Sequence, residues 1–153
     1  MLLSELLAPE RIRVPLRGTS KEELLSELVQ LVSAGADGED GDEVLRAVRE
    51  REAVLSTGIG NAVAIPHGKS AAVPELCMAA GRTASPVDFD ALDAQPVSLF
   101  FLLVGPETAA GPHIKALSRI SRLVRKEAVR DQLIAARTAQ EFLDIMKESE
   151  AQA

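Results

Sequence analysis

His67 and His113 are the only two histidines in the chain, and imidazole chemistry is the first function that the sequence suggests. His67 lies in the run AIPHGKS, from Ala64 to Ser70. An unperturbed imidazole has a pKa of about 6.5, so much of it is neutral and nucleophilic near neutral pH. When such a ring accepts a phosphoryl group, the N–P bond is labile, which suits a group that is passed on. His67 is therefore a candidate phosphoryl acceptor.

The residues near His67 in the sequence suit an anion. Gly58 and Gly68 leave room for a bulky charged partner close to the backbone. Thr57 supplies a hydroxyl, and the glycine-rich turns supply backbone N–H groups. Pro66 fixes the backbone before His67 and can aim its ring. The sequence thus predicts a phosphate-binding loop that includes Thr57, Gly58 and Gly68.

Two further groups come from distant parts of the chain. His113 follows Gly111 and Pro112 at the expected start of a helix, where N–H groups and the helix dipole favour phosphate. Arg51 is a cation that can stabilise the charge of a transferring phosphoryl group. Spacing alone does not bring these residues to His67, so their meeting depends on the fold.

A nucleotide site is the competing interpretation, because Gly68-Lys69-Ser70 looks like the end of a P-loop. A P-loop needs another glycine five residues before Gly68, and that position is Val63. Two histidines and one cysteine make a poor zinc site, and the acidic run Gly35–Asp42 does not match a calcium loop. We therefore expect no cofactor and no metal.

Length and composition narrow the class of protein. The chain has 153 residues, which predicts one domain spanning 1–153, and 46% of them are hydrophobic. The formal net charge of −6 argues against binding to nucleic acid or to an anionic membrane. A lone cysteine, Cys77, suits a reducing compartment. The longest apolar run, Leu99–Val104, is too short to span a bilayer. These features predict a cytoplasmic protein without membrane insertion.

The order of the expected elements indicates the fold class. Ser20 and Glu23 form a capping box that begins a helix, and Thr138 and Glu141 form another. Gly35–Asp42 is expected to be a turn. Further helices are expected over Glu43–Glu52, from Gly111-Pro112 onward, and over Ala128–Ala136. In the second of these, the inward residues are expected to be Ile114, Leu117, Ile120 and Val124. Strands are expected at Arg11–Val14, Ala62–Ile65, Cys77–Thr83 and Val97–Val104. This order predicts an α/β (α+β) fold with a single mixed sheet flanked by helices on both sides.

The stretch REAVLSTGIGNAVAIPHGKS, from Arg51 to Ser70, closely resembles the active-site segment of the EIIA domains of the fructose–mannitol–nitrogen class. These domains belong to the bacterial phosphoenolpyruvate-dependent phosphotransferase system. The resemblance continues through Ser85–Glu107 and Pro112–Val124, in the same order. The sequence differs from the family pattern at Ala62, a position where glycine is expected in many members.

The resemblance implies roles for three residues. His67 matches the phosphorylated histidine of the family, His113 matches the second histidine that assists it, and Arg51 matches an arginine near the site. It also implies a protein that receives a phosphoryl group from the carrier HPr or from the nitrogen-branch relative of HPr.

Three interpretations remain open at this stage. The N-terminal stretch is more like the nitrogen-regulatory EIIA, whose phosphorylation state controls partner proteins, and the chain shows no fused EIIB, HPr or membrane domain. Alternatively, a sugar-specific EIIA passes the phosphoryl group to an EIIB during uptake of fructose or mannitol. A regulatory interaction module without turnover is the third alternative, against which the presence of both histidines argues.

Overall fold

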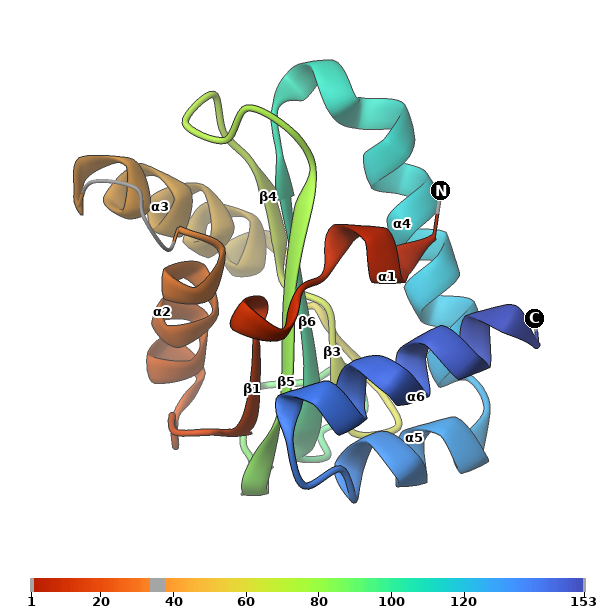
Figure 1. Ribbon diagram of the computed structural model, residues 1–153. Helices are drawn as coiled ribbons and strands as arrows, with labels where there is room; N and C mark the ends of the chain where they lie inside the picture. Colours follow the sequence, from red (N-terminus) through yellow and green to blue (C-terminus); the bar gives the residue numbers. More distant parts are fainter. Residues whose placement is uncertain (1, 34–37, 153) are drawn as a thin grey trace.

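A mixed six-stranded sheet lies at the centre of the computed structural model, which describes residues 2–33 and 38–152 (Figure 1). Its strands are β1 (Ile12–Leu16), β2 (Gly58–Gly60), β3 (Val63–Ala64), β4 (His67–Lys69), β5 (Cys77–Val87) and β6 (Val97–Gly105). The helices are α1 (Leu3–Leu6), α2 (Lys21–Val32), α3 (Gly38–Val54), α4 (Ala110–Val124), α5 (Glu127–Ile134) and α6 (Ala139–Ala151). Short 3₁₀ turns span Pro9–Arg11 and Glu107–Ala109. The predicted fold class is confirmed.

β6 is the central strand, and all nine of its residues are buried. It pairs antiparallel with β5 along one edge, and β1 then pairs parallel with β5. Along its other edge β6 pairs parallel with β3 and then with β4, while β2 pairs antiparallel with β3. The expectation of a central strand covered on both faces is confirmed by this burial.

Helices cover both faces of the sheet, as Figure 1 shows. Leu99, Phe101 and Leu103 of β6 belong to a core that is shared with α1, α4, α5 and α6. The alternate residues Phe100 and Leu102 belong to a second core, which is shared with α2 and α3. Successive side chains of a strand point to opposite faces, so β6 contributes to both cores at once.

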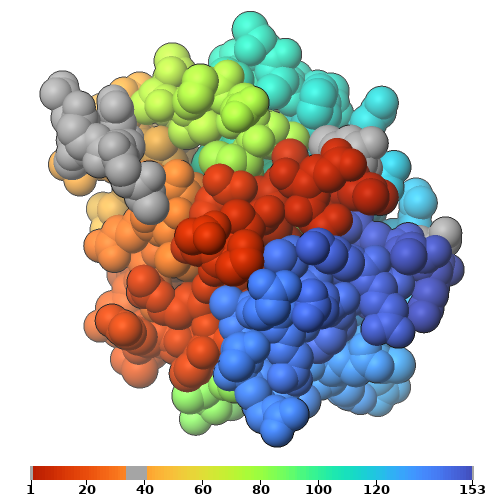
Figure 2. All heavy atoms as spheres, viewed as in Figure 1, coloured from red at the N-terminus to blue at the C-terminus, as the bar shows by residue number. Residues whose placement is uncertain are grey.

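The two ends of the chain lie side by side on one of these faces. Figure 2 shows the N-terminal segment, in red, lying against α6, in blue. The backbone N–H of Ser4 donates to the Glu150 carboxylate at 2.9 Å, and Glu150 also accepts from the N–H of Leu3. Across the described residues, no helix combines the length and apolarity needed to cross a membrane.

Two expectations from the sequence need correction in this part of the fold. The turn expected at Gly35–Asp42 falls partly on 35–37, which lie outside the described residues, and from Gly38 onward the chain is already helical. Acidic residues are favoured in the first turns of a helix, so a polar composition did not exclude one there. The strand expected at Cys77–Thr83 extends to Val87, because β6 pairs again with Val87 beyond an irregularity that follows Arg82.

The turn between β2 and β3 explains why glycine is expected at position 62. Asn61 has φ 57° and Ala62 has φ 65°, so both central residues of the turn are left-handed. This pattern suits the right-handed twist of a hairpin, but it is unfavourable for a residue with a Cβ. Asn tolerates the conformation better than alanine does, and glycine adopts it at no steric cost.

We expect Ala62→Gly to raise the free energy of unfolding by about 0.5–1 kcal/mol, because relief of left-handed strain exceeds the entropy that glycine adds to the unfolded chain. Urea denaturation of the two proteins measures this difference. Ala128→Gly in α5 is the control: it lies in an exposed helical turn and should lower stability by about 0.5–1 kcal/mol. A loss of stability in both variants would contradict the proposed strain.

Candidate functional site

The sheet brings His67 and His113 together. β3 and β4 run along the same edge of β6 in one register, with Val63 opposite Leu99 and His67 opposite Leu103. Residues that pair across parallel strands share a face, so the His67 side chain lies on the side of Leu103, the face that α4 covers. The rings of His67 and His113 are 5.5 Å apart between centroids and inclined at 66°.

This pairing places His67 in a strand. His67 is the first residue of β4, a strand of three residues with little local sequence signal. The next residue, Gly68, points to the other face, where a Cβ would lie 3.1 Å from the backbone nitrogen of Val48 in α3. Glycine therefore permits the close approach of α3 to β4, while the strand directs His67 toward α4.

One ring nitrogen of His67 is fixed by the backbone. Its Nδ1 lies 2.9 Å from the carbonyl oxygen of Ile65. A carbonyl oxygen only accepts hydrogen bonds, so Nδ1 must carry the proton. In the neutral ring, Nε2 then keeps its lone pair, and it is the nitrogen available as a nucleophile.

His113 occupies a buried position at the start of α4 and is only 3% exposed. The apolar spacing predicts that Ile114 faces inward, which is wrong: Ile114 is 67% exposed. The buried residues of α4 start one position earlier and include Ala116 and Ile120. The Nδ1 of His113 has no hydrogen-bond partner among the described residues, which is unusual for a buried polar atom.

Burial and neighbouring charges keep both histidines neutral. Burial lowers the pKa of His113 to about 4, and the charges of His67 and Lys69 add to the effect. Burial also lowers the pKa of His67, although its hydrogen bond to Ile65 opposes the change. The positive charges of Arg51 and Lys69 lower the pKa of His67, while Glu52 raises it. The nucleophilic form of His67 is thus favoured at neutral pH.

Arg51 lies in the last turn of α3, on the far side of the sheet from α4. Its Nη1 donates to the carbonyl oxygen of Leu55 at 2.9 Å, which holds the guanidinium beside the end of the helix. Its charge is close enough to influence the pKa of His67. Among the described residues, no hydrogen bond or ion pair joins Arg51 to either histidine, so its role at the site stays a prediction.

A buried carboxylate that the sequence analysis missed organises this region. Glu52 is 5% exposed, and its oxygens accept from the N–H of Thr57 at 3.0 Å and from the Thr57 hydroxyl at 2.6 Å. Lys21 pairs with the same carboxylate at 3.0 Å, and its Nζ also lies 4.8 Å from the ring centroid of Phe89. The sequence offered no signal for this cluster, because its members lie on three separate segments.

The cluster connects to His67 through the backbone. Thr57 accepts a hydrogen bond from the N–H of Ile65 at 3.0 Å, and Ile65 in turn accepts from Nδ1 of His67. Glu52 therefore fixes Thr57, Thr57 fixes Ile65, and Ile65 orients the imidazole. The first link has two hydrogen bonds and each of the other two has one, all with a defined donor and acceptor.

In the expected phosphate-binding loop, the donors of Thr57 and Gly58 already have hydrogen-bond partners within the protein. Both donors of Thr57 are directed to Glu52, and the N–H of Gly58 donates to the Ser56 hydroxyl at 3.1 Å. Gly68 lies within β4 and packs against α3. Phosphate binding by Thr57, Gly58 and Gly68 stays a prediction, whereas their contacts in this structure support the backbone around His67.

Comparison with known proteins agrees with this architecture. The family described as "Phosphoenolpyruvate-dependent sugar phosphotransferase system, EIIA 2" matches residues 5–149. The chain is similar to a "Nitrogen regulatory protein" of Bradyrhizobium diazoefficiens, with 38% identity over 146 residues that are 95% of each protein. It is also similar to a "PTS system fructose-specific EIIABC component" of Bacillus subtilis, with 35% identity over 148 residues. That match covers 97% of this chain but only 23% of the longer protein.

A solved structure shows the same fold at comparable identity. The crystal structure of the nitrogen regulatory protein IIA-Ntr from Neisseria meningitidis superposes with a TM-score of 0.86 and 34% identity. The superposition covers 94% of this chain and 98% of that one.

The first prediction from the site concerns the pH dependence of stability. The lowered pKa of His113 means that the unfolded chain binds a proton below about pH 6.5, whereas the folded protein binds it only near pH 4. Stability is therefore lost as the pH falls through this window. The free energy of unfolding should drop between pH 8 and pH 5 by about 2 kcal/mol more in the wild type than in His113→Gln. Urea denaturation at both values measures the drop, and equal drops would contradict a neutral buried His113.

The second prediction concerns the buried carboxylate. Glu52→Gln replaces an acceptor oxygen by an NH₂ donor that faces Thr57 or Lys21, so we expect a loss of about 2–4 kcal/mol in unfolding free energy. Glu22→Gln is a matched control, because Glu22 pairs with Arg49 at 2.9 Å at the exposed surface. That variant should lose less than about 1 kcal/mol. Similar losses in both variants, measured by urea denaturation, would show that Glu52 has no special structural role.

Proposed function

The chain belongs to the EIIA 2 family of the phosphoenolpyruvate-dependent sugar phosphotransferase system, and we propose that it carries a phosphoryl group between proteins on Nε2 of His67. The observation that carries this proposal is the hydrogen bond from Nδ1 of His67 to the Ile65 carbonyl. It leaves Nε2 as the nucleophile of a ring whose pKa is lowered and whose orientation is fixed. Members of this family transfer phosphoryl groups, so the proposed chemistry agrees with the family.

The proposed step is an in-line transfer from a phosphohistidine of the donor protein. The Nε2 lone pair of His67 forms the new N–P bond, while the old N–P bond breaks and its electron pair stays on the donor imidazole. The His67 ring becomes more positive as the new bond forms. The Ile65 carbonyl stabilises that ring, because it accepts the Nδ1–H bond throughout the step.

Charge stabilisation is the proposed role of His113 and Arg51. His113 is buried 5.5 Å from His67, and its ring has a nitrogen without a partner among the described residues, which suits a group that bonds when phosphoryl oxygens arrive. Arg51 and Lys69 supply positive charge near the ring. Positioned groups of this kind account for most of the catalysis of phosphoryl transfer.

The proposed donor is HPr or its nitrogen-branch relative, because a protein partner suits the surface beside the histidines. Ile114, next to His113, is 67% exposed and apolar, and exposed apolar side chains are typical of the core of a protein interface. We place this exchange in the cytoplasm, in keeping with the single cysteine.

For the downstream partner, we propose regulatory target proteins of a nitrogen-type EIIA. The relatives named for nitrogen regulation match this chain over nearly their whole length. A sugar-specific role, with transfer to an EIIB, is the second candidate, since the fructose-specific relative is 35% identical.

Incubation with phosphoenolpyruvate, enzyme I and HPr tests the proposal, with the general and the nitrogen-branch pairs used in separate reactions. We expect acid-labile phosphate on the wild type and none on His67→Ala. We also expect labelling of His113→Gln to be roughly 100-fold slower, as is typical when one charge-stabilising group is removed. Transfer from labelled protein to a purified EIIB separates the sugar-specific role from the regulatory one.

Circular dichroism spectra of each variant are the control that checks whether it is folded. Failure of both donor pairs to label the wild type would favour an interaction module without turnover. Full labelling of His67→Ala would move the acceptor to another residue, and an unchanged rate for His113→Gln would remove His113 from the site.

A further inference from the structure

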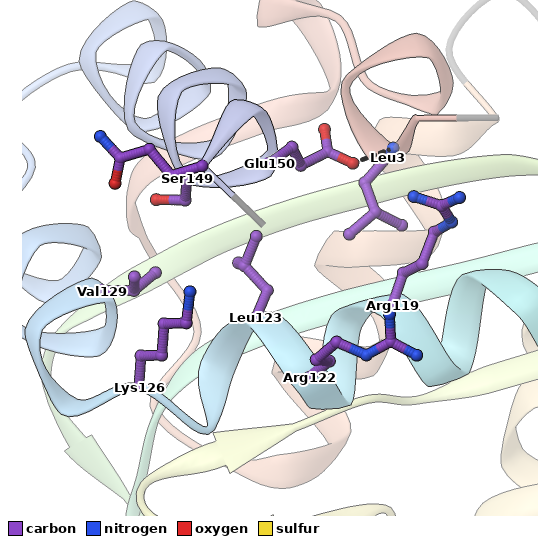
Figure 3. A pocket seen from close by; sticks show the side chains of 9 residues that line it. Leu3, Arg119, Arg122, Leu123, Lys126, Val129, Ser149 and Glu150 are labelled. Carbon is purple, nitrogen blue, oxygen red and sulfur yellow. Dashed lines mark hydrogen bonds between the residues drawn. The ribbon is translucent and has the colours of Figure 1, made fainter.

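A pocket lies where α1, α4, α5 and α6 meet, away from the histidine pair (Figure 3). Its volume is about 250 Å³, below the roughly 300–1,000 Å³ of pockets for drug-sized ligands. The residues that line it come from both ends of the chain, from the C-terminal half of α4 and from the start of α5. The proposed function of His67 does not use any of them.

Three cations surround this pocket. Arg119 and Arg122 lie on α4, and Lys126 lies just beyond its end. All three are exposed, and none forms an ion pair with another described residue. Unpaired cations that line one pocket favour an anionic ligand.

The basic character of this region stands out from the rest of the chain. From Ala110 to Lys126 the sequence has five lysines and arginines and no acidic residue, although the formal net charge of the whole protein is −6. Lys115, Arg119 and Arg122 follow a helical spacing along α4 and form one stripe, and Lys126 lies in the bend beyond its end. Arg119 and Arg122 of this stripe line the pocket.

The floor of the pocket is apolar. Leu123 projects from α4 between the two arginines and Lys126, and Leu3 closes the side toward α1 (Figure 3). Val129 and Leu123 are both less than a tenth exposed, and Leu3 is 1% exposed. A ligand seated here would thus contact hydrocarbon on one side and cations on the other.

Two residues of α6 and Gln152, just after it, complete the lining. Ser149 is 9% exposed and contributes a hydroxyl to the wall. The Glu150 carboxylate accepts from the N–H groups of Leu3 and Ser4, so part of its charge is directed at the start of α1. The single acidic residue in the lining therefore bonds to the backbone of α1, and it forms no ion pair with the cations that line the pocket.

We propose that this pocket binds a small phosphomonoester that carries an apolar group. Arg119 and Arg122 would bind the phosphate, and the apolar group would lie on Leu3, Leu123 and Val129. Lys126, on the other side of Leu123, adds positive charge to the pocket. Arginine matches phosphate oxygens with paired N–H groups. Several unpaired cations around one pocket attract a dianion more strongly than a monoanion. This site is separate from His67 and does not depend on phosphoryl transfer.

Phenyl phosphate is the probe for this proposal, with inorganic phosphate and benzyl alcohol as the two halves of its chemistry. Titration is followed by the backbone amide shifts of the ¹⁵N-labelled full chain. We expect shifts at residues of α4, α5 and α6 that line the pocket. Phenyl phosphate should bind roughly tenfold more tightly than inorganic phosphate, because it also buries the ring.

A pair of double variants tests the role of the cations. Arg119→Gln/Arg122→Gln should weaken phenyl phosphate binding by tenfold or more. Lys115→Gln/Arg125→Gln removes the same charge from exposed positions of the same stretch of chain that do not line the pocket, and it should change affinity by less than twofold.

Three results would overturn the proposal. Equal loss of affinity in both double variants would mean general attraction of anions to a basic surface. Equal affinity for inorganic phosphate and phenyl phosphate would mean that the apolar floor does not take part. Amide shifts confined to residues around His67 would mean that the probe binds at the histidine pair instead.

Discussion

The buried carboxylate of Glu52 is the interaction on which the geometry around His67 depends. A charge that is 5% exposed is costly unless it is paired and hydrogen-bonded, and here Lys21 and both donors of Thr57 satisfy it. The same bonds fix the segment that leads to Ile65, whose carbonyl orients the imidazole. The charge that stabilises the turn after α3 also determines which nitrogen of His67 is nucleophilic.

β6 provides the second constraint, because it sets the register of the interrupted strand beside it. β3 and β4 keep one register along β6 although Pro66 separates them, and the Pro66 carbonyl still accepts from Leu103 at 3.0 Å. The alternation of side chains then places His67 toward α4 and Gly68 toward α3. A shift of one residue would reverse both positions, so the buried pattern of β6 and the small size of glycine define the site together.

Much of this could be predicted from the sequence, because the signals are local. The capping boxes, the apolar run of β6 and the types of residue around His67 identified the fold class and the candidate acceptor. Contacts that are set by tertiary packing could not be predicted in this way. The ion pair of Lys21 with Glu52 joins two segments that are far apart in the sequence and show no common pattern. His113 rather than Ile114 faces inward because of how α4 is rotated on the sheet, which the apolar spacing did not resolve.

In the proposed function, the pKa of His113 changes between the unmodified and the phosphorylated form of the protein. In the unmodified protein, burial and the charges of His67 and Lys69 act against protonation of His113. In the proposed phosphorylated form, a group with about two negative charges would stand beside the ring, and an opposite charge raises the pKa of a histidine. The same buried position would then favour an imidazole that donates to the phosphoryl oxygens. A neutral pair suits acceptance of the group, and a hydrogen-bonded pair suits holding it until the next protein arrives.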